Sequence, residues 1–189
     1  ASSIQVHVRG DTGGDLTLIT AADAKYFERL SNFIGSVHFW EPFLHIDIYD
    51  LGLASEQLTH VQEWDRTSLF ETSYTDIPLV GWKFAVVLDA LTRHSRVLWM
   101  DANAELRRPL TAIRHSLNEK GYFLTVAGHR FPTPKTVRPA TLEHFDCHAA
   151  FASMPECTSA YLGVVRGSEL HALLPSLDKC ASSRDCLYP

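Results

Sequence analysis

The sequence has no apolar run long enough to cross a membrane. A helix that spans a bilayer needs ~20 consecutive apolar residues, and no stretch of the 189 residues approaches that length. The first residues, Ala1 to Ile4, lack the charged and apolar regions of a signal peptide. We therefore expect no transmembrane segment in this chain.

Basic residues are not in excess either. The chain carries 17 Lys and Arg against 22 Asp and Glu, which gives a net charge of -5 at pH 7. General nucleic-acid binders present a basic face that neutralises phosphates. Nucleic acid is therefore not an expected partner.

Several catalytic motifs are missing. The sequence contains no P-loop, no GxGxxG, no GxSxG and no HExxH. The sequence therefore contains no motif that would indicate a kinase, a dehydrogenase, a serine hydrolase or a zincin. What the chain does have is 46% hydrophobic residues, enough for one core of ordinary size, so a single domain over residues 1–189 is expected.

Cysteine is scarce and confined to the last quarter of the chain. The sequence has four cysteines and no CxxC: Cys147, Cys157, Cys180 and Cys186. Because the spacing of a structural zinc site is absent, disulfides are favoured over metal binding. Among the three pairings, the sequence-local one joins Cys147 to Cys157 and Cys180 to Cys186. Disulfides predict an oxidising compartment; four buried thiols in a cytosolic protein are the alternative.

Strand-like and helix-like segments alternate along the chain. Residues 1–14 are expected to form an arm or an edge strand. The expected strands cover 15–20, 44–50, 97–100, 122–127 and 161–165, and the expected helices cover 26–34, 55–64, 82–93, 109–119 and 170–177. This alternation predicts an α/β fold, with a mostly parallel central sheet and helices on both faces.

The segment 97–106 carries the main candidate site. Val97 to Met100 form an apolar run that predicts a strand buried on both faces, and the run stops at Asp101. Ligands of open α/β sheets gather beyond the carboxyl ends of the strands. There, Asp101 and Asn103 could offer two oxygen ligands to Mg²⁺ or Mn²⁺ beside nucleotide phosphates. The alternative is that Asp101 opens a turn or caps the next helix.

Five segments together resemble a known family. They read IYDLGL at 48–53, GWKFAVVLDAL at 81–91, VLWMDANAELRRPL at 97–110, GYFLT at 121–125, and TSAYLGVVRGSELHALLPSLDKCASSRDCLYP at 158–189. In combination they resemble the GT-A glycosyltransferase fold, in particular the nucleotide-diphospho-sugar transferase-like families of eukaryotes. The second and third segments carry most of the resemblance.

The resemblance implies a sugar transferase with a nucleotide-diphosphate donor. Asp101 and Asn103 stand at the family's metal-binding DxD position. The second acid is replaced by Asn103, which supplies an oxygen without charge, so metal affinity is expected to depend more on the donor phosphates. Glu105 is a further candidate, with a solvent-facing position after the turn as the favoured alternative.

Other residues at strand and helix ends are candidates for donor binding. Lys83, at the start of a helix, could contact the diphosphate; the alternative is an exposed lysine. Thr20, Ala21 and Ala22 close the first strand and leave room for a nucleoside base. Asp50 could meet the base or ribose, or accept hydrogen bonds within a turn.

A basic loop follows the 122–127 strand. Such loops often carry recognition, so an acceptor or phosphate rim is a candidate role for four residues: His129, Arg130, Lys135 and Arg138. No residue is assigned as a catalytic base. The family continues beyond the cysteine segment with a histidine-bearing motif, so we expect residues 147–189 to be an incomplete C-terminal part.

The leading hypothesis is a metal-assisted glycosyltransferase that transfers a sugar from a nucleotide diphosphate to a glycan or protein hydroxyl. Its expected location is the Golgi lumen, where nucleotide sugars and disulfides coexist. A non-catalytic nucleotide-sugar or carbohydrate-binding module is the alternative. A haloacid-dehalogenase-like phosphatase fits less well, because its nucleophile lies near the first strand whereas Asp101 is central.

Overall fold

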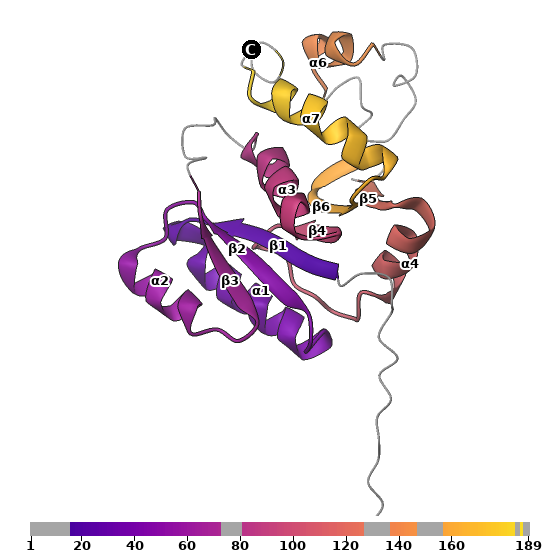
Figure 1. Cartoon of the computed structure of the whole chain (residues 1–189). Helices are drawn as coiled ribbons and strands as arrows, with labels where there is room; N and C mark the ends of the chain where they lie inside the picture. The colour runs from indigo at the N-terminus through magenta and orange to yellow at the C-terminus, as the bar shows by residue number, and fades with distance from the viewer. Residues whose placement is uncertain (1–15, 73–80, 127–136, 147–156, 184–185, 187–189) are drawn as a thin grey trace, which may run out of the picture.

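The computed structural model describes residues 16–72, 81–126, 137–146, 157–183 and 186 (Figure 1). The predicted arm 1–14 and most of the segment between the first two cysteines lie outside these ranges. Within them, no helix combines the length and apolar character needed to cross a membrane.

The described strands form one six-stranded mixed sheet. In chain order they are β1 (Leu16–Ala22), β2 (His45–Asp50), β3 (Thr67–Glu71), β4 (Arg96–Met100), β5 (Tyr122–Val126) and β6 (Cys157–Val165). Their order across the sheet is β3-β2-β1-β4-β6-β5. Neighbours among the first four are parallel, whereas β6 runs antiparallel to both β4 and β5. The predicted mostly parallel central sheet is confirmed.

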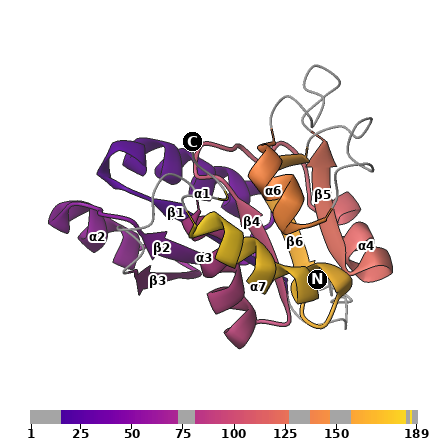
Figure 2. The same ribbon diagram turned by 90° about the horizontal axis from the view of Figure 1, so that it is seen from above.

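Helices cover both faces of the sheet, as predicted. On one face α1, α2 and α4 bury side chains such as Phe33 against Leu18. On the other, Val87 of α3 and Leu174 of α7 pack near Trp99, and α7 lies beside α3 in both views (Figures 1 and 2). The helices are η1 (Ala24–Tyr26), α1 (Phe27–Trp40), α2 (Ser55–Gln62), α3 (Trp82–Arg93), α4 (Thr111–Lys120), α6 (Pro139–His144) and α7 (Glu169–Ala181).

Several predicted boundaries hold and others shift. The predicted helix 82–93 coincides with α3, whereas α4 begins at Thr111 rather than at 109, because Leu110 takes the N-cap position. Ser55, a residue type that often caps helices, is not the N-cap of α2. Ala54 is the N-cap, and its backbone N–H donates to Gln57 Oε1 (2.9 Å). Ser55 is instead the first helical residue.

Two elements, β3 and α6, are not predicted from the sequence pattern. β3 is an edge strand whose residues are mostly half-buried, so it lacks the buried alternation that marks a strand. The helix α6 has no buried residue to give it an apolar face. In addition, β6 begins at Cys157, ahead of the predicted 161–165 strand.

A polar cluster anchors α3 to β2. Tyr49 donates its hydroxyl hydrogen to Asp89 (2.7 Å), and Arg93 donates to both Asp89 (2.8 Å) and the Tyr49 oxygen (2.6 Å). Burial and the Asp89 carboxylate raise the pKa of Tyr49 well above its usual range, so the hydroxyl stays protonated. His94 Nε2, just past α3, lies 2.8 Å from the buried Asp47 Oδ2. These contacts fix α3 on the sheet and so position its first turn.

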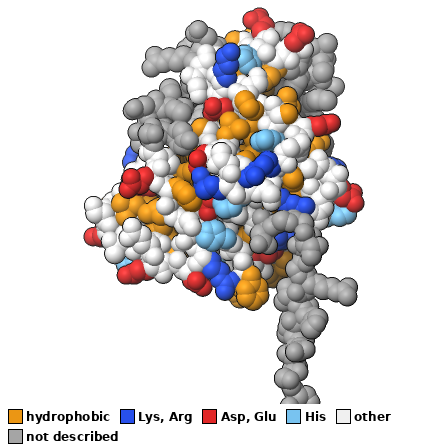
Figure 3. Space-filling model, viewed as in Figure 1, with side chains coloured by type: hydrophobic (Ala, Val, Ile, Leu, Met, Phe, Trp, Pro, Cys, Tyr) orange, Lys and Arg blue, Asp and Glu red, His pale blue; other side chains and the backbone are white. Residues whose placement is uncertain are grey.

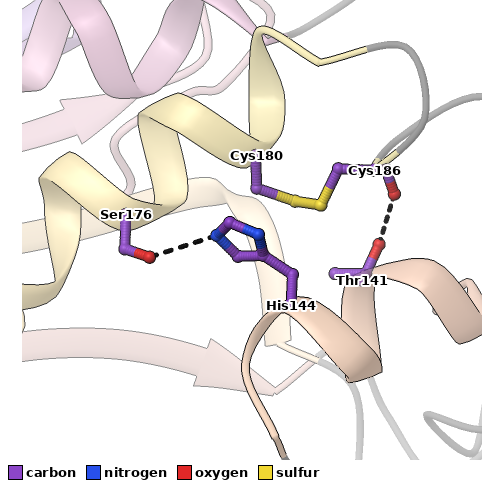
Figure 4. Close-up of a disulfide and its surroundings, with 5 residues drawn as sticks. All are labelled: Thr141, His144, Ser176, Cys180 and Cys186. Carbon is purple, nitrogen blue, oxygen red and sulfur yellow. Dashed lines mark hydrogen bonds between the residues drawn. A yellow bond between two sulfur atoms is a disulfide. The ribbon is translucent and has the colours of Figure 1, made fainter.

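One predicted disulfide is confirmed. Cys180, near the end of α7, is bonded to Cys186, with 5.3 Å between the two Cα atoms (Figure 4). Thr141 of α6 donates to the backbone oxygen of Cys186 (2.6 Å), and His144 Nε2 lies 3.2 Å from Ser176 Oγ. The disulfide therefore closes a short loop against which α6 is held.

The other predicted bridge, from Cys147 to Cys157, is not borne out. In the described part of the chain Cys157 is an exposed, free cysteine, and Cys147 lies outside that part. Cys157 opens β6 opposite Val126 of β5. Sheet pairing therefore sets its position, and sequence spacing carries no information about that pairing.

Replacing Gly121 by Ala is expected to destabilise the fold by roughly 1–3 kcal/mol, since a left-handed conformation disfavours a side chain. Gly121 ends α4 with φ +77°, and an added Cβ would lie 2.7 Å from Ser168 Cβ. Chemical denaturation provides the measurement. Gly35→Ala is the matched control, because nothing lies within 4 Å of the added Cβ. Inside α1 this change is expected to stabilise by about 0.5–1 kcal/mol; equal effects at both glycines would contradict the argument.

Candidate functional site

The candidate site lies at the edge where the parallel strands end. Ala22 of β1 pairs with Asp50 of β2, and Ile19 of β1 pairs with Trp99 of β4. Because the strands are parallel, their carboxyl ends meet at this edge, and Asp101 follows β4 directly. The start of β6 reaches the same edge, since β6 is antiparallel to β4. The predicted site residues on these strands are therefore gathered at one edge.

Lys83 and Asp101 form a direct ion pair. Lys83 Nζ lies 2.7 Å from Asp101 Oδ1, and Lys83 is 9% exposed. A lysine is almost never this buried unless it is paired. The alternative of an exposed lysine at this position is therefore wrong. α3 brings the ammonium group to the end of β4, so two candidates 18 positions apart in sequence share one contact.

Tryptophans support the same carboxylate. Trp99 Nε1 donates to Asp101 Oδ1 (2.9 Å), and the Lys83 ammonium lies 5.5 Å from the centre of the Trp99 ring. Trp82 packs edge-on against Trp99, with 5.4 Å between ring centres. Two donors therefore hold one oxygen of Asp101 and fix the orientation of the carboxylate.

Backbone contacts at the start of β6 complete the support. The backbone N–H of Asp101 donates to Ala160 O (3.1 Å), and Lys83 Nζ lies 3.4 Å from Ser159 O. Neither Trp99 nor these β6 residues are among the sequence candidates. The sequence marks Trp99 only as part of an apolar run, and nothing in it places β6 next to β4.

The oxygens available to a metal ion come from Asp101 and Asn103. The Asp101 side chain is 28% exposed and its engaged atom is Oδ1; Asn103 is exposed on the following turn. Glu105 is exposed and accepts from Arg107 (3.1 Å), as its solvent-facing alternative anticipated. The described residues contain no group of three His, Cys, Asp or Glu placed to hold a metal. A metal ion held by these two side chains would need its remaining ligands from a bound donor and water.

The residues that close β1 are fully packed. Ala21 and Ala22 turn their side chains into the two cores on opposite faces of the sheet. The Ala22 carbonyl accepts from Leu51 N (3.0 Å). Thr20 is completely buried, and its Oγ1 has no hydrogen-bond partner among the described residues. For Ala21 and Ala22, contact with a base would therefore rest on the backbone.

Asp50 stabilises the turn that follows β2. Its Oδ1 accepts from the backbone N–H groups of Gly52 (2.8 Å) and Leu53 (2.6 Å). The predicted turn-acceptor alternative is therefore confirmed. Asp50 pairs with Ala22 in the β1–β2 register and so lies at the same edge of the sheet.

The predicted basic rim is mostly outside the described residues. His129, Arg130 and Lys135 lie there, whereas Arg138 is described and is the N-cap of α6. Within the described ranges, the buried NH1 of Arg138 has no hydrogen-bond partner. The structure therefore does not join Arg138 to the other candidates.

Solved structures resemble this fold. No protein-family model and no curated protein matches the sequence. The galactosyltransferase LgtC, solved with donor and acceptor sugar analogs, superposes with a TM-score of 0.54 at 12% identity, over 79% of this chain and 57% of LgtC. The bifunctional glycosyltransferase WbbM gives 0.54 at 11% identity, over 93% of this chain and 38% of WbbM.

A third similar structure is the glycosyltransferase GlyE of Streptococcus pneumoniae, with a TM-score of 0.53 at 13% identity, over 88% of this chain and 38% of GlyE. The chain thus spans less than two thirds of each of these proteins. Together the matches define the class: this protein has a GT-A-like glycosyltransferase fold.

Proposed function

We propose that the chain is part of a glycosyltransferase that transfers a sugar from a nucleotide-diphosphate donor to a hydroxyl of a glycan or protein. The observation that carries the proposal is the Lys83–Asp101 pair at the carboxyl edge of the parallel strands. In open α/β sheets this edge is where ligands bind. The GT-A-like fold supports sugar transfer as the chemistry of the site.

The proposal includes Mg²⁺ or Mn²⁺. Asp101 and Asn103 would hold the cation, together with the donor diphosphate. The cation would offset the negative charge that grows on the diphosphate as the glycosidic bond breaks. Lys83 would orient the Asp101 carboxylate and add a second positive charge beside the diphosphate.

The nucleoside part of the donor is assigned to the ends of β1 and β2. Backbone groups of Thr20, Ala21 and Ala22 would meet the base, and Asp50 would meet the ribose. These roles are inferred from the position of the residues at the ends of the two strands. The position is the argument because Asp50 Oδ1 already accepts hydrogen bonds within its own turn.

A binding module without turnover is the second candidate. The observation that favours it is Asn103, which lowers the negative charge of the metal site. Calorimetry with a panel of nucleotide sugars, with and without Mn²⁺, tests binding. A radiolabelled transfer assay with glycan acceptors on the same protein tests turnover. Binding with transfer supports the enzyme, binding without transfer supports the module, and absence of both overturns the proposal.

Asn103→Asp is expected to tighten Mn²⁺ binding about tenfold, because a second carboxylate replaces a neutral ligand. Calorimetric titration of the protein with Mn²⁺ measures the change in affinity. Glu105→Gln serves as the control, since Glu105 is exposed and paired with Arg107. Unchanged Mn²⁺ affinity in Asn103→Asp would assign Asn103 to the turn alone.

We also propose an oxidising compartment, and the Golgi lumen as the specific one. The support for it is the Cys180–Cys186 disulfide, because such bonds persist in secretory compartments. The similar solved structures add no support for the Golgi.

A further inference from the structure

The Lys83 ammonium group has three attractive neighbours. Its Nζ lies 2.7 Å from Asp101 Oδ1, 3.4 Å from the backbone oxygen of Ser159 and 5.5 Å from the centre of the Trp99 ring. A carboxylate, a carbonyl oxygen and the face of an indole ring all attract a positive charge. Since Lys83 is also 9% exposed, the ammonium group is held beside the Asp101 carboxylate rather than directed into solvent.

The charges of Lys83 and Asp101 cancel before any ligand binds. Trp99 Nε1 donates to the same Asp101 oxygen (2.9 Å), so Oδ1 already has two donors. Asn103, the second proposed metal ligand, is neutral and exposed. Within the described ranges, no cluster of three or more His, Cys, Asp or Glu is able to hold a metal. The proposed metal ligands therefore carry no net charge when Lys83 is counted with them.

Lys83 is expected to act in opposite directions on two ligands. A divalent cation beside Asp101 would be repelled by the ammonium group, and charges this close interact strongly in a partly buried site. A nucleoside diphosphate would be attracted by both the cation and the ammonium group, and its oxygens would complete the coordination of the cation. The diphosphate would thus offset the repulsion between the two positive charges.

We propose that Lys83 makes cation binding conditional on the nucleoside diphosphate. Free Mg²⁺ or Mn²⁺ is kept out by the ammonium group, whereas the cation and the diphosphate bind together. The inference rests on the proposed function, because it concerns the same site. It adds a role for Lys83 that orientation of Asp101 does not require: removal of a lysine that only supports the site would not tighten cation binding.

The first test is calorimetry on the unaltered protein with Mn²⁺ alone, with UDP, GDP and ADP alone, and with each nucleotide in the presence of Mn²⁺. Mn²⁺ alone is expected to bind at Asp101 with a dissociation constant weaker than about 1 mM. Mn²⁺ is expected to tighten binding of at least one nucleotide about tenfold or more. Tighter binding of Mn²⁺ alone at Asp101 overturns this inference and leaves the proposed function standing. If Mn²⁺ tightens binding of none of the nucleotides, both are overturned.

Binding of Mn²⁺ elsewhere on the surface has to be separated from binding at the site. The protein has a net charge of -5, and Figure 3 shows Asp and Glu side chains scattered over the face that carries α3 and α7. Asp101→Asn removes the charged ligand of the site and leaves these surface carboxylates in place. Mn²⁺ binding that persists in Asp101→Asn is therefore assigned to the surface, and only the remainder is compared.

The second test uses variants of Lys83. Lys83→Gln is expected to tighten binding of Mn²⁺ alone about tenfold, because the repelling charge is removed. Lys83→Arg keeps the charge, so Mn²⁺ should bind as weakly as to the unaltered protein. Adding Asp101→Asn to Lys83→Gln should cancel the gain. Unchanged or weaker Mn²⁺ binding in Lys83→Gln, with its fold verified by circular dichroism, overturns the inference. If Lys83→Gln does not fold, the measurements on the unaltered protein decide.

Discussion

Asp101→Asn is expected to lower the affinity for a nucleoside diphosphate in the presence of Mn²⁺ by about 100-fold. The change removes the only charged oxygen ligand of the proposed metal site. Asn retains an oxygen that can accept from Trp99 and Lys83, as Asp101 Oδ1 does (2.9 and 2.7 Å). Calorimetry with and without Mn²⁺ measures the loss, using the nucleoside diphosphate that binds best to the unaltered protein.

The choice of Asn over Ala follows from the ion pair. Both changes remove the counter-charge of the Lys83 ammonium, which is 9% exposed, but Ala would also remove the oxygen that accepts from Lys83 and Trp99. Breaking a buried pair in this way costs about 3–5 kcal/mol, and partial exposure of Asp101 reduces that cost. Glu105→Gln controls for general loss of negative charge nearby. If Asp101→Asn binds as tightly as the unaltered protein in Mn²⁺, Asp101 is not a metal or diphosphate ligand.

Lys83→Gln is expected to weaken binding of the same nucleoside diphosphate at least about tenfold and to leave binding of the bare nucleoside unchanged. The reason is that only the diphosphate presents negative charge to the ammonium group. The variant should also lose about 1–3 kcal/mol of stability, because Asp101 loses a charged hydrogen-bond partner. Calorimetry and thermal unfolding measure the two effects.

Lys25→Gln is the matched control for Lys83→Gln. Lys25 is an exposed lysine in η1, just after β1 ends at the same edge of the sheet. Its replacement should change neither diphosphate affinity nor stability. Equal losses of diphosphate and nucleoside binding in Lys83→Gln would indicate structural damage rather than lost charge. A double substitution with Asp101→Asn should show coupling between the two positions, since they are in contact.

The Lys83–Asp101 contact links the fold to the proposed chemistry. α3 is anchored at its far end by the Tyr49, Asp89 and Arg93 cluster, and its first turn carries Lys83 to the end of β4. Substitutions in that cluster would therefore act on the site indirectly, through the placement of α3. A buried pair of this kind holds its partners in one arrangement only while both charges are present.

The sequence alone determined those elements whose apolar residues recur with a clear period. Helical spacing of apolar residues predicted α3 with its observed bounds, and the apolar run 97–100 predicted a strand buried on both faces. These features are local, because the burial of each side chain along an element leaves a period in the sequence. For the same reason the end of the apolar run was enough to predict that Asp101 lies at a strand end.

Only the tertiary structure decided which elements are neighbours. Three features depend on contacts between segments far apart in the chain: the insertion of β6 between β4 and β5, the pairing of Lys83 with Asp101, and the free Cys157. The spacing of apolar residues along a helix or strand shows which of its faces is buried. It does not show which other element packs against that face. Partner choice follows from packing of the whole core, which fixed α3 and β6 around the end of β4.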